Sequence, residues 1–357
     1  MRLGYREFLA FTIAVALVAL LPGCAAATPP PSSAAAVCTK MAAPYGSNRA
    51  SGTASSPFRT VQRLLDALRA GETGCLLAGS YYGDIKFTHG GRSGAPVTLK
   101  SAPGRVARIV GRLWIPEGSN YVDVDDLRLD ARNDLPSPSV DSADDQFLGD
   151  DVTNQHTDIC FDLGDGEYGA ASKTLIAYDR IHACGSLPPG NHEHGIYVAD
   201  ATNTTIEWNL IYDNADRGIQ LYPDAQDTTI DHNVIADNGE NFDFSGDEGT
   251  ASDNADVYDN IIADPASATN IYSWYPLGSP LGTGNVLQDN CVYGGSPAID
   301  TSGGGFTPQD NLIADPEFVN AAAFDYGLRA SSQCLPRTGN IAAAVDHYDL
   351  AVGGGAR

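Results

Sequence analysis

The sequence predicts an all-β chain wound into a parallel β-helix, a solenoid of stacked short strands. Three observations predict this fold class. An apolar-x-x-Asn-x-apolar pattern recurs in "IEWNLI", "IDHNVI", "VYDNII", "LQDNCV" and "PQDNLI". A second strand-like motif lies between these copies, as in "HGIYV" and "RGIQL". No helical pattern of about ten residues joins the strands, so the apolar faces are buried by stacking successive copies.

The recurring asparagines predict a structural ladder along the axis of the solenoid. They occupy one turn position in successive copies, namely Asn209, Asn233, Asn260, Asn290 and Asn311. A buried amide without a partner costs about 1–3 kcal/mol, so we expect each amide to bond to the coils on either side. The variable spacing of the copies is typical of turns that change length while the strands stay in register.

Several stretches resemble the pectate lyase-like superfamily of right-handed parallel β-helix proteins. Residues 56–85 resemble that group's N-terminal cap and first coil. The cap begins with an amphipathic helix whose apolar residues have helical spacing: Val61, Leu64, Leu65 and Leu68. Other stretches resemble the next coil and the closing coil of that group: residues 93–104, 315–318 and 326–334. The resemblance implies a right-handed parallel β-helix over about residues 50–335, and it does not imply one activity, because this scaffold carries many.

The N-terminus predicts export. Arg2 and Arg6 precede the apolar run 8–21, which is short for a membrane span. The following "LPGC" ends at Cys24 and resembles a bacterial lipobox, in which the cysteine is lipidated. Ordinary signal cleavage after residues 25–27 is the alternative, and either route places the protein outside the cytoplasm, as a membrane-anchored lipoprotein or a secreted protein.

The sequence therefore divides into three segments. Residues 1–23 are a lipoprotein-type signal peptide, and residues 24–37 are a low-complexity tether. Residues 38–357 form one β-helix domain that includes the cap at about residues 56–70 and a closing coil. We expect a monomer that meets the membrane only through its lipid anchor.

Six further cysteines predict disulfides, because the compartment is oxidising. Proximity along the chain favours Cys38 with Cys75, Cys160 with Cys184, and Cys291 with Cys334, although other pairings stay open. The chain has no C-x-x-C spacing, so a zinc site is only weakly supported.

The charge of the chain restricts its partners. Formal net charge is −24, which argues against nucleic acid, whose phosphates need Lys and Arg. It also weighs against an acidic polymer unless a cation or a local basic group reverses the field. A polysaccharide is the expected partner.

Alignment of the second motif predicts a reactive centre. If Ile196, Val198, Ile219 and Leu221 point inward, Tyr197 and Gln220 point outward on adjacent strands. We expect His194 and Arg217 to share that outward face as axial neighbours. Lengthened turns, above all residues 133–151 and 184–191, would wall a cleft there together with residues 245–256 and 275–284.

The resemblance suggests a uronate-polymer lyase or C5-epimerase as the activity. In this hypothesis Arg217 holds the substrate carboxylate, His194 is the base and Tyr197 is the acid. Further substrate contacts are expected from the same face: Gln220, Asp243, Tyr272, Trp274 and Tyr275. The Asp-Pro-His-Asp motif of β-helix mannuronan epimerases is missing, since the chain has "NHEH" instead, so no matched motif supports this reaction.

Other interpretations stay open, including whether the protein is an enzyme. A non-catalytic carbohydrate-binding or cell-surface coil is one alternative. A glycoside hydrolase is another, with Asp243 and Asp247 or Asp200 and Asp224 as its carboxylates. The Asp-rich residues 141–151 and 162–167 make Ca²⁺ a candidate cofactor. A metal site at His192 and His194 is weakly supported, because no third ligand is evident.

Overall fold

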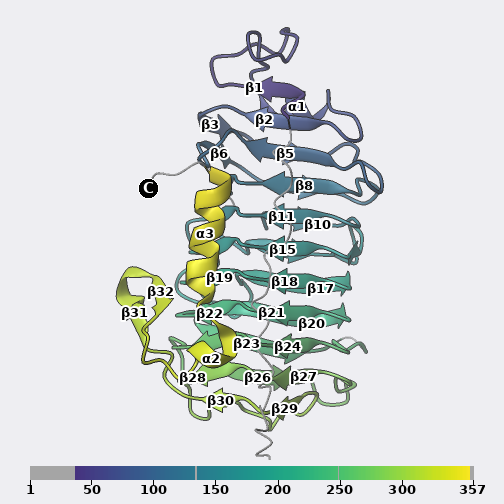
Figure 1. Cartoon of the computed structure of the whole chain (residues 1–357). Helices are drawn as coiled ribbons and strands as arrows, with labels where there is room; N and C mark the ends of the chain where they lie inside the picture. The colour runs from purple at the N-terminus through teal and green to yellow at the C-terminus, as the bar shows by residue number, and fades with distance from the viewer. Residues whose placement is uncertain (1–36, 133–134, 248, 354–357) are drawn as a thin grey trace, which may run out of the picture. The chain divides into compact units, whose positions relative to one another are not determined.

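The described part of the chain is a right-handed parallel β-helix (Figure 1). It is seen in a computed structural model that describes residues 37–132, 135–247 and 249–353. Each coil contributes strands to three parallel sheets, which we call the first, second and third sheets in the order the chain visits them. The predicted fold class is confirmed.

The strands of each sheet follow in coil order. The first sheet contains β1 (Lys40–Ala42), β2 (Thr73–Leu76), β5 (Val97–Ser101), β8 (Val122–Asp125), β11 (Gln146–Leu148), β15 (Leu175–Ala177), β18 (Thr205–Glu207), β21 (Thr229–Asp231), β24 (Asp256–Tyr258), β27 (Val286–Gln288) and β29 (Thr307–Gln309). The second sheet contains β3 (Gly79–Tyr82), β6 (Ala107–Val110), β9 (Arg128–Asp130), β12 (Asp151–Thr153), β16 (Arg180–His182), β19 (Leu210–Tyr212), β22 (Val234–Ala236), β25 (Ile261–Ala263), β28 (Cys291–Tyr293) and β30 (Leu312–Ile313). The third sheet contains β4 (Ile85–Lys86), β7 (Leu113–Ile115), β10 (Ser139–Val140), β13 (Phe161–Leu163), β14 (Ala171–Ser172), β17 (Ile196–Thr202), β20 (Arg217–Gln226), β23 (Glu240–Ser245) and β26 (Ile271–Trp274).

Alternation along each strand builds the core. In the third sheet, Ile196, Ile219, Phe242 and Ile271 are register partners on successive coils, and all are fully buried. Burying a side chain of this size stabilises the fold by about 1.5–3 kcal/mol. The residues between these inward positions face outward, so one face of the sheet is free to carry polar and aromatic groups.

The asparagine ladder runs along the turn between the first and second sheets. Its members are Asn209, Asn233, Asn260, Asn290 and Asn311. Each Oδ1 accepts bonds from both the backbone N–H and the Nδ2 of the preceding member, at 2.8–3.0 Å. The Nδ2 groups also donate to backbone carbonyls, so these buried amides fix the axial register.

Two aspartates extend the ladder towards the N-terminus. The backbone N–H of Asp179 donates to Asn209, and that of Asp150 donates to Asp179. Leu127 in turn donates its backbone N–H to Asp150. A second ladder joins Asn214 to Asn238 at 2.8 Å. It does not follow the repeat pattern, because the residue two places after each asparagine is acidic, Asp216 and Glu240, where the pattern has an apolar residue.

Residues 133–151 are not the long loop that the sequence predicted. Their described part supplies β10 and β11 and so forms a coil of its own. Val140 and Phe147 point into the core, while Asp145 accepts a backbone N–H from Val122 at 2.8 Å. The acidic residues of this segment are typical of an exposed loop, so the sequence does not reveal the coil. In the structure, Asp145 and Asp150 instead accept backbone N–H groups.

The N-terminal cap matches its prediction. Helix α1 (Val61–Leu65) begins at Thr60, whose side chain accepts the backbone N–H of Arg63. Its residues Leu64 and Leu65 are buried, as is Leu68 just beyond the helix. The helix covers apolar side chains that the first coil would otherwise expose.

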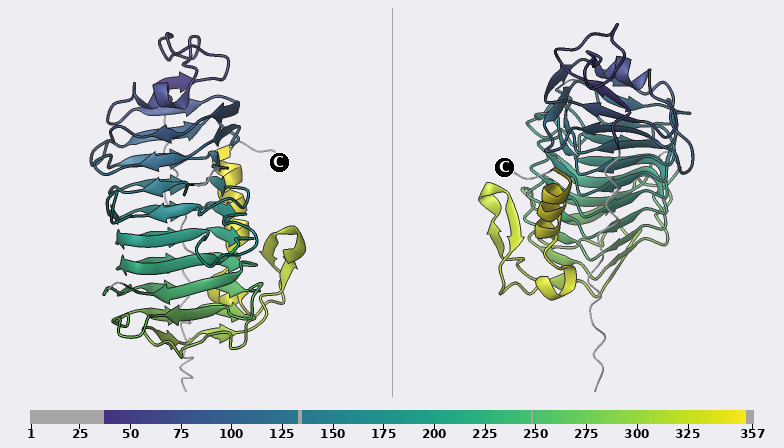
Figure 2. Two further views of the ribbon diagram at one scale, coloured as in Figure 1. Left: turned by 180° about the vertical axis from the view of Figure 1, so that it is seen from behind. Right: turned by 45° about the horizontal axis from the view of Figure 1, so that its top comes forward.

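The C-terminal part differs from the expected closing coil. Strands β31 (Phe318–Asn320) and β32 (Asp325–Leu328) pair antiparallel around the short helix η1 (Ala321–Ala323). Helices α2 (Leu335–Thr338) and α3 (Ile341–Gly353) follow, and α3 lies along the side of the coils (Figure 2).

Helix α3 is held to the coils by charge and by ring stacking. Arg180 pairs with Asp346 and Asp349, and Arg105 also pairs with Asp349. Tyr348 stacks on Tyr178 with ring centroids 4.3 Å apart. One short helix therefore links several successive coils.

The described residues contain three disulfides, in the pairings that proximity favoured: Cys38–Cys75, Cys160–Cys184 and Cys291–Cys334. They indicate an extracytoplasmic protein. Among the described residues, no helix is long and apolar enough to span a membrane. The predicted signal peptide, the predicted lipidation site Cys24 and nearly all of the predicted tether lie outside the described residues.

Asp179→Asn should stabilise the protein. Burial raises the pKa of the Asp150 and Asp179 carboxyls well above the ordinary value, and the Oδ2 of each is buried without a hydrogen-bond partner. Because a raised pKa costs stability as pH rises from about 4 through the folded-state value, the gain should be larger at pH 7 than at pH 4. We expect about 1–2 kcal/mol at pH 7 by chemical denaturation.

Asp227→Asn is the matched control, because Asp227 is exposed; its free energy of unfolding should change by no more than about 0.5 kcal/mol. An Asp179→Asn variant no more stable than the parent at pH 7 would contradict the account of the ladder.

Candidate functional site

A cleft of about 410 Å³ opens over the C-terminal half of the third sheet. The structure brings seven of the predicted site residues to it: His194, Tyr197, Arg217, Gln220, Asp243, Tyr272 and Trp274. It also brings four residues that were not predicted to contact substrate: Asn191, His192, Tyr222 and Glu240. These side chains come from β17, β20, β23 and β26 and from the turns that precede or follow them.

Parallel register sets the floor of the cleft. Tyr197 pairs with Gln220, Gln220 with Asp243, and Asp243 with Tyr272. These four outward residues form one column with a spacing of about 4.8 Å. The column crosses four coils and matches the predicted alignment of the second motif.

His194 and Arg217 occupy corresponding positions on adjacent coils. The backbone N–H of Gly195 donates to the Arg217 carbonyl at 2.9 Å, which continues the pairing of Ile196 with Ile219. His194 lines the cleft as predicted, but strict alternation does not explain this, because His194 lies three positions before Tyr197 and alternation would put the two on opposite faces. β17 begins at Ile196, so His194 lies in the approach to the strand, and there it reaches the cleft while only 2% exposed.

The surroundings of His194 keep its imidazole neutral. Burial lowers its pKa well below the ordinary value, and the charges of Arg217 and His192 act in the same direction. A hydrogen bond with Gln220 opposes this shift, while Nδ1 is buried without a hydrogen-bond partner in the structure. Neutral His194 therefore has one unprotonated ring nitrogen that can accept a proton.

Arg217 is anchored through its Nε. That atom donates to the Tyr272 hydroxyl at 2.6 Å and lies 3.4 Å from Glu240 and 3.3 Å from Asp243. Its terminal nitrogens point the other way, where Nη2 donates to Asn191 Oδ1 at 2.6 Å. The guanidinium thus has an inner side fixed by the sheet and an outer edge held by a loop.

Two carboxylates flank Arg217. Asp243 is fully buried and accepts bonds from Gln220 and Ser245. Burial raises its pKa to about 6, although Arg217 opposes the shift. Glu240 is partly exposed and accepts the Tyr272 hydroxyl at 2.7 Å. The two carboxylates partly neutralise Arg217, so the cleft is not strongly positive.

Aromatic rings line one side of the cleft. Tyr197 and Tyr222 lie with ring centroids 6.2 Å apart, and Tyr222 and Trp274 lie 6.3 Å apart. Trp274 is 49% exposed, so its ring is available to a sugar face. Burial raises the pKa of Tyr197, which keeps its phenol protonated. Tyr275 does not line the cleft, since its hydroxyl packs towards Gly282 and Gly305.

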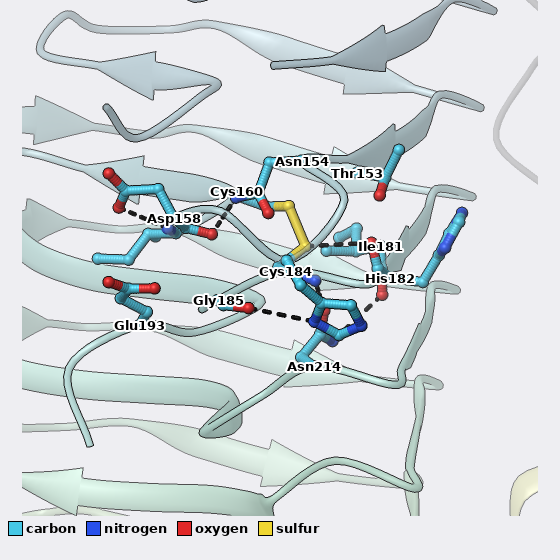
Figure 3. Close-up of a disulfide and its surroundings, with 12 residues drawn as sticks. Thr153, Asn154, Asp158, Cys160, Ile181, His182, Cys184, Gly185, Glu193 and Asn214 are labelled. Atoms are coloured by element: carbon cyan, nitrogen blue, oxygen red, sulfur yellow. Dashed lines mark hydrogen bonds between the residues drawn. A yellow bond between two sulfur atoms is a disulfide. The ribbon is translucent and has the colours of Figure 1, made fainter. Parts of the chain in front are cut away.

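One of the predicted wall loops borders the cleft. It is the predicted segment 184–191, and because the same turn continues to Glu193 we call it loop 185–193; Asn191 and His192 of this loop line the cleft. Among the described residues, none from 245–256 or 275–284 lines the cleft. The Cys160–Cys184 disulfide lies at the start of this segment, as Figure 3 shows. Next to it, the Gly185 N–H donates to the Asp158 carbonyl at 2.6 Å.

The Asp-rich stretches do not form a metal-binding cluster. Within the described ranges, no group of three or more His, Cys, Asp or Glu side chains is arranged to hold a metal ion. Asp141 accepts the Trp114 Nε1–H, and Asp145 and Asp150 accept backbone N–H groups. These carboxylates have protein donors in place of a cation.

Neither of the alternative carboxylate pairs lies wholly in the cleft. Asp200 and Asp224 are register partners on adjacent coils, but neither lines the cleft. Asp247 accepts the Tyr222 hydroxyl at 3.2 Å and stands beside the cleft residues without lining the cleft. Glu240, which pairs with Arg217 in the sheet register, is the second acid of the cleft. Extending the motif alignment by one coil from Arg217 would have found it.

Comparisons with known proteins agree with this architecture. A family model described as "Right handed beta helix region" matches residues 151–314. A crystal structure of pectate lyase Pel9A is similar at a TM-score of 0.58 and 14% identity, covering 83% of this chain and 90% of the other. A rhamnogalacturonan lyase is similar at a TM-score of 0.52 and 11% identity, covering 78% and 90%. No curated protein sequence matches the chain.

At these identities the likeness to solved structures extends to the fold alone. The family match covers the coils that carry the cleft, from β12 to β30. On this evidence, the described part of the chain has the right-handed parallel β-helix fold, which it shares with pectate lyase Pel9A.

Proposed function

We propose that the protein binds a uronate-containing polysaccharide in the cleft and acts on it as a lyase or C5-epimerase. The observation that carries this proposal is the convergence of His194, Tyr197 and Arg217 in one cleft beside an aromatic wall. The similar structures are named for pectate and rhamnogalacturonan lyases. Because their likeness concerns the fold, the proposal rests on the cleft.

Each of the three residues suits one part of the chemistry. Arg217 would neutralise the substrate carboxylate and so make the adjacent C5 proton more acidic. Neutral His194 would take that proton, and the protonated Tyr197 would donate one. The His194 and Tyr197 ring centroids are 5.5 Å apart, close enough for both to reach one sugar ring.

The lyase reaction would be a β-elimination. The C5–H bond breaks and its proton passes to His194. Its electron pair forms the C4–C5 double bond as the C4–O4 bond breaks. Tyr197 protonates the departing O4. In an epimerase the C4–O4 bond would survive and C5 would be reprotonated from the opposite face.

His194→Gln and Tyr197→Phe should each lower kcat by about 10²–10⁴-fold on the true substrate. Turnover is measured on a panel of polysaccharides by absorbance near 235 nm for unsaturated uronates, with and without Ca²⁺, and by NMR for epimerisation. Because the pKa of His194 is lowered, the acid limb of the pH profile should lie below the 6.5 of an ordinary histidine.

Tyr275→Phe is the matched control, since it removes the same atom from a tyrosine outside the cleft. Full activity of His194→Gln would contradict the assigned base. Binding of a polysaccharide without any turnover would favour the non-catalytic carbohydrate-binding alternative.

Glycoside hydrolysis is the second candidate, favoured by Glu240 and Asp243. Glu240 Oε2 and Asp243 Oδ2 lie 3.4 and 3.3 Å from Arg217 Nε, so these two oxygens are at most about 6.7 Å apart, an upper bound that admits the roughly 5–5.5 Å spacing of retaining hydrolases. The raised pKa of Asp243 suits a general acid, although its full burial limits contact with substrate.

If the protein is a glycoside hydrolase, it should release reducing ends from a polysaccharide without forming unsaturated uronates. The Glu240→Gln variant should lose this release of reducing ends. Asp224→Asn is the matched control, because Asp224 lies on the same sheet outside the cleft. Hydrolysis retained in Glu240→Gln would exclude this carboxylate pair.

We also propose that the protein is anchored outside the cytoplasm through lipidated Cys24. The three disulfides support an oxidising compartment. Expression in a bacterium with a lipoprotein pathway should place the protein in the membrane fraction, and Cys24→Ala should release it. Equal membrane recovery of both forms would contradict the lipid anchor.

A further inference from the structure

The outer edge of Arg217 is occupied by a single loop residue. Nη2 donates to Asn191 Oδ1 at 2.6 Å, and Nη1 donates to the Asn191 backbone carbonyl at 3.3 Å. Asn191 is exposed, whereas Arg217 is only 5% exposed. The loop residue thus helps to shield the guanidinium edge from solvent.

The contact has the form of carboxylate recognition. Two oxygens of one residue face the two terminal nitrogens of the guanidinium, as the two oxygens of a carboxylate do in a bidentate pair. The inner Nε is engaged separately by Tyr272 at 2.6 Å. Loss of the Asn191 side chain would therefore leave the bond from Arg217 Nε to Tyr272 intact and remove only the bond to Nη2 at the outer edge.

The loop is fixed at its base and exposed at its tip. Gly185 and Ser186 bond to Asp158 and Thr157, and the backbone N–H groups of His192 and Glu193 donate to Asp216. Residues 187–192 are all exposed. Asn191 adopts a left-handed backbone with φ of 70°, which asparagine tolerates better than most residues. Its bonds to Arg217 join the tip to the floor of the cleft.

We propose that Asn191 is a built-in occupant of the carboxylate position, which a uronate must displace to reach Arg217. This inference rests on the proposed function, in which Arg217 binds the substrate carboxylate. Loop 185–193 then regulates access to the cleft, and affinity for uronates is lowered by competition from Asn191. Neutral sugars, which do not need the Arg217 edge, would not meet this competition.

The first test measures exposure of Arg217 without any substrate. Phenylglyoxal, which modifies accessible guanidinium groups, is applied to the folded protein, and Arg217 modification is followed by peptide mass spectrometry. Asn191→Ala should raise its rate about tenfold, the size expected when hydrogen bonds to a charged group are lost. Asn191→Asp should lower the rate, because its carboxylate forms a bidentate ion pair with the same edge.

Leu187→Ala is the matched control, since it truncates an exposed residue on the same loop. It should leave the Arg217 rate unchanged, and a thermal melt checks that each variant is folded. An unchanged Arg217 rate in Asn191→Ala would overturn the proposal, whatever the substrate is.

The second test measures binding of oligogalacturonate and of its fully methyl-esterified form by calorimetry. Asn191→Ala should bind the acidic form about tenfold more tightly than the parent and the ester equally. Equal affinity of parent and variant for the acidic form would overturn the occupancy role while leaving the uronate function standing. If phenylglyoxal confirms the exposure but oligogalacturonate, oligomannuronate and oligoguluronate bind to neither protein, the proposed uronate function fails instead.

Discussion

The constraint on which the rest of the structure depends is the axial register of the coils. Parallel strands repeat at about 4.8 Å, and the amide ladder from Asn209 to Asn311, buried except at Asn311, holds each of these coils in register with the next. If a strand shifted its register by one residue, its apolar side chains would face solvent and the ladder amides would lose their hydrogen-bond partners. The same register brings Tyr197, Arg217 and Tyr272 together, although 75 residues separate the first from the last.

The predictable part of the fold is the part that repeats. Ladder asparagines and inward apolar positions recur in the coils from β18 to β30, so their pattern indicates stacking without knowledge of contacts. The coil at β10 and β11 was missed because aspartates replace the asparagines there and accept backbone N–H groups. Helix α3 was missed because its docking depends on Arg105 and Arg180, which are more than 150 residues away along the chain.

The sequence predicts which site residues stack on successive coils, but it does not predict which loop residues reach the cleft. Register alone placed Gln220, Asp243 and Tyr272 in one column. The contacts of Asn191 and the approach of His194 depend on loop conformation, which has no period in the sequence. Tyr275 follows directly after β26, and alternation beyond a strand end no longer determines which way a side chain points.

The central claim is that the outer edge of Arg217 recognises a carboxylate within reach of His194. A crystal structure of the protein with a bound oligouronate tests it most directly. We expect a substrate carboxylate at about 3 Å from both terminal nitrogens of Arg217, with Asn191 withdrawn and C5 of the sugar facing His194. A sugar bound in the cleft with its carboxylate turned away from Arg217, and Asn191 still in place, would contradict the account.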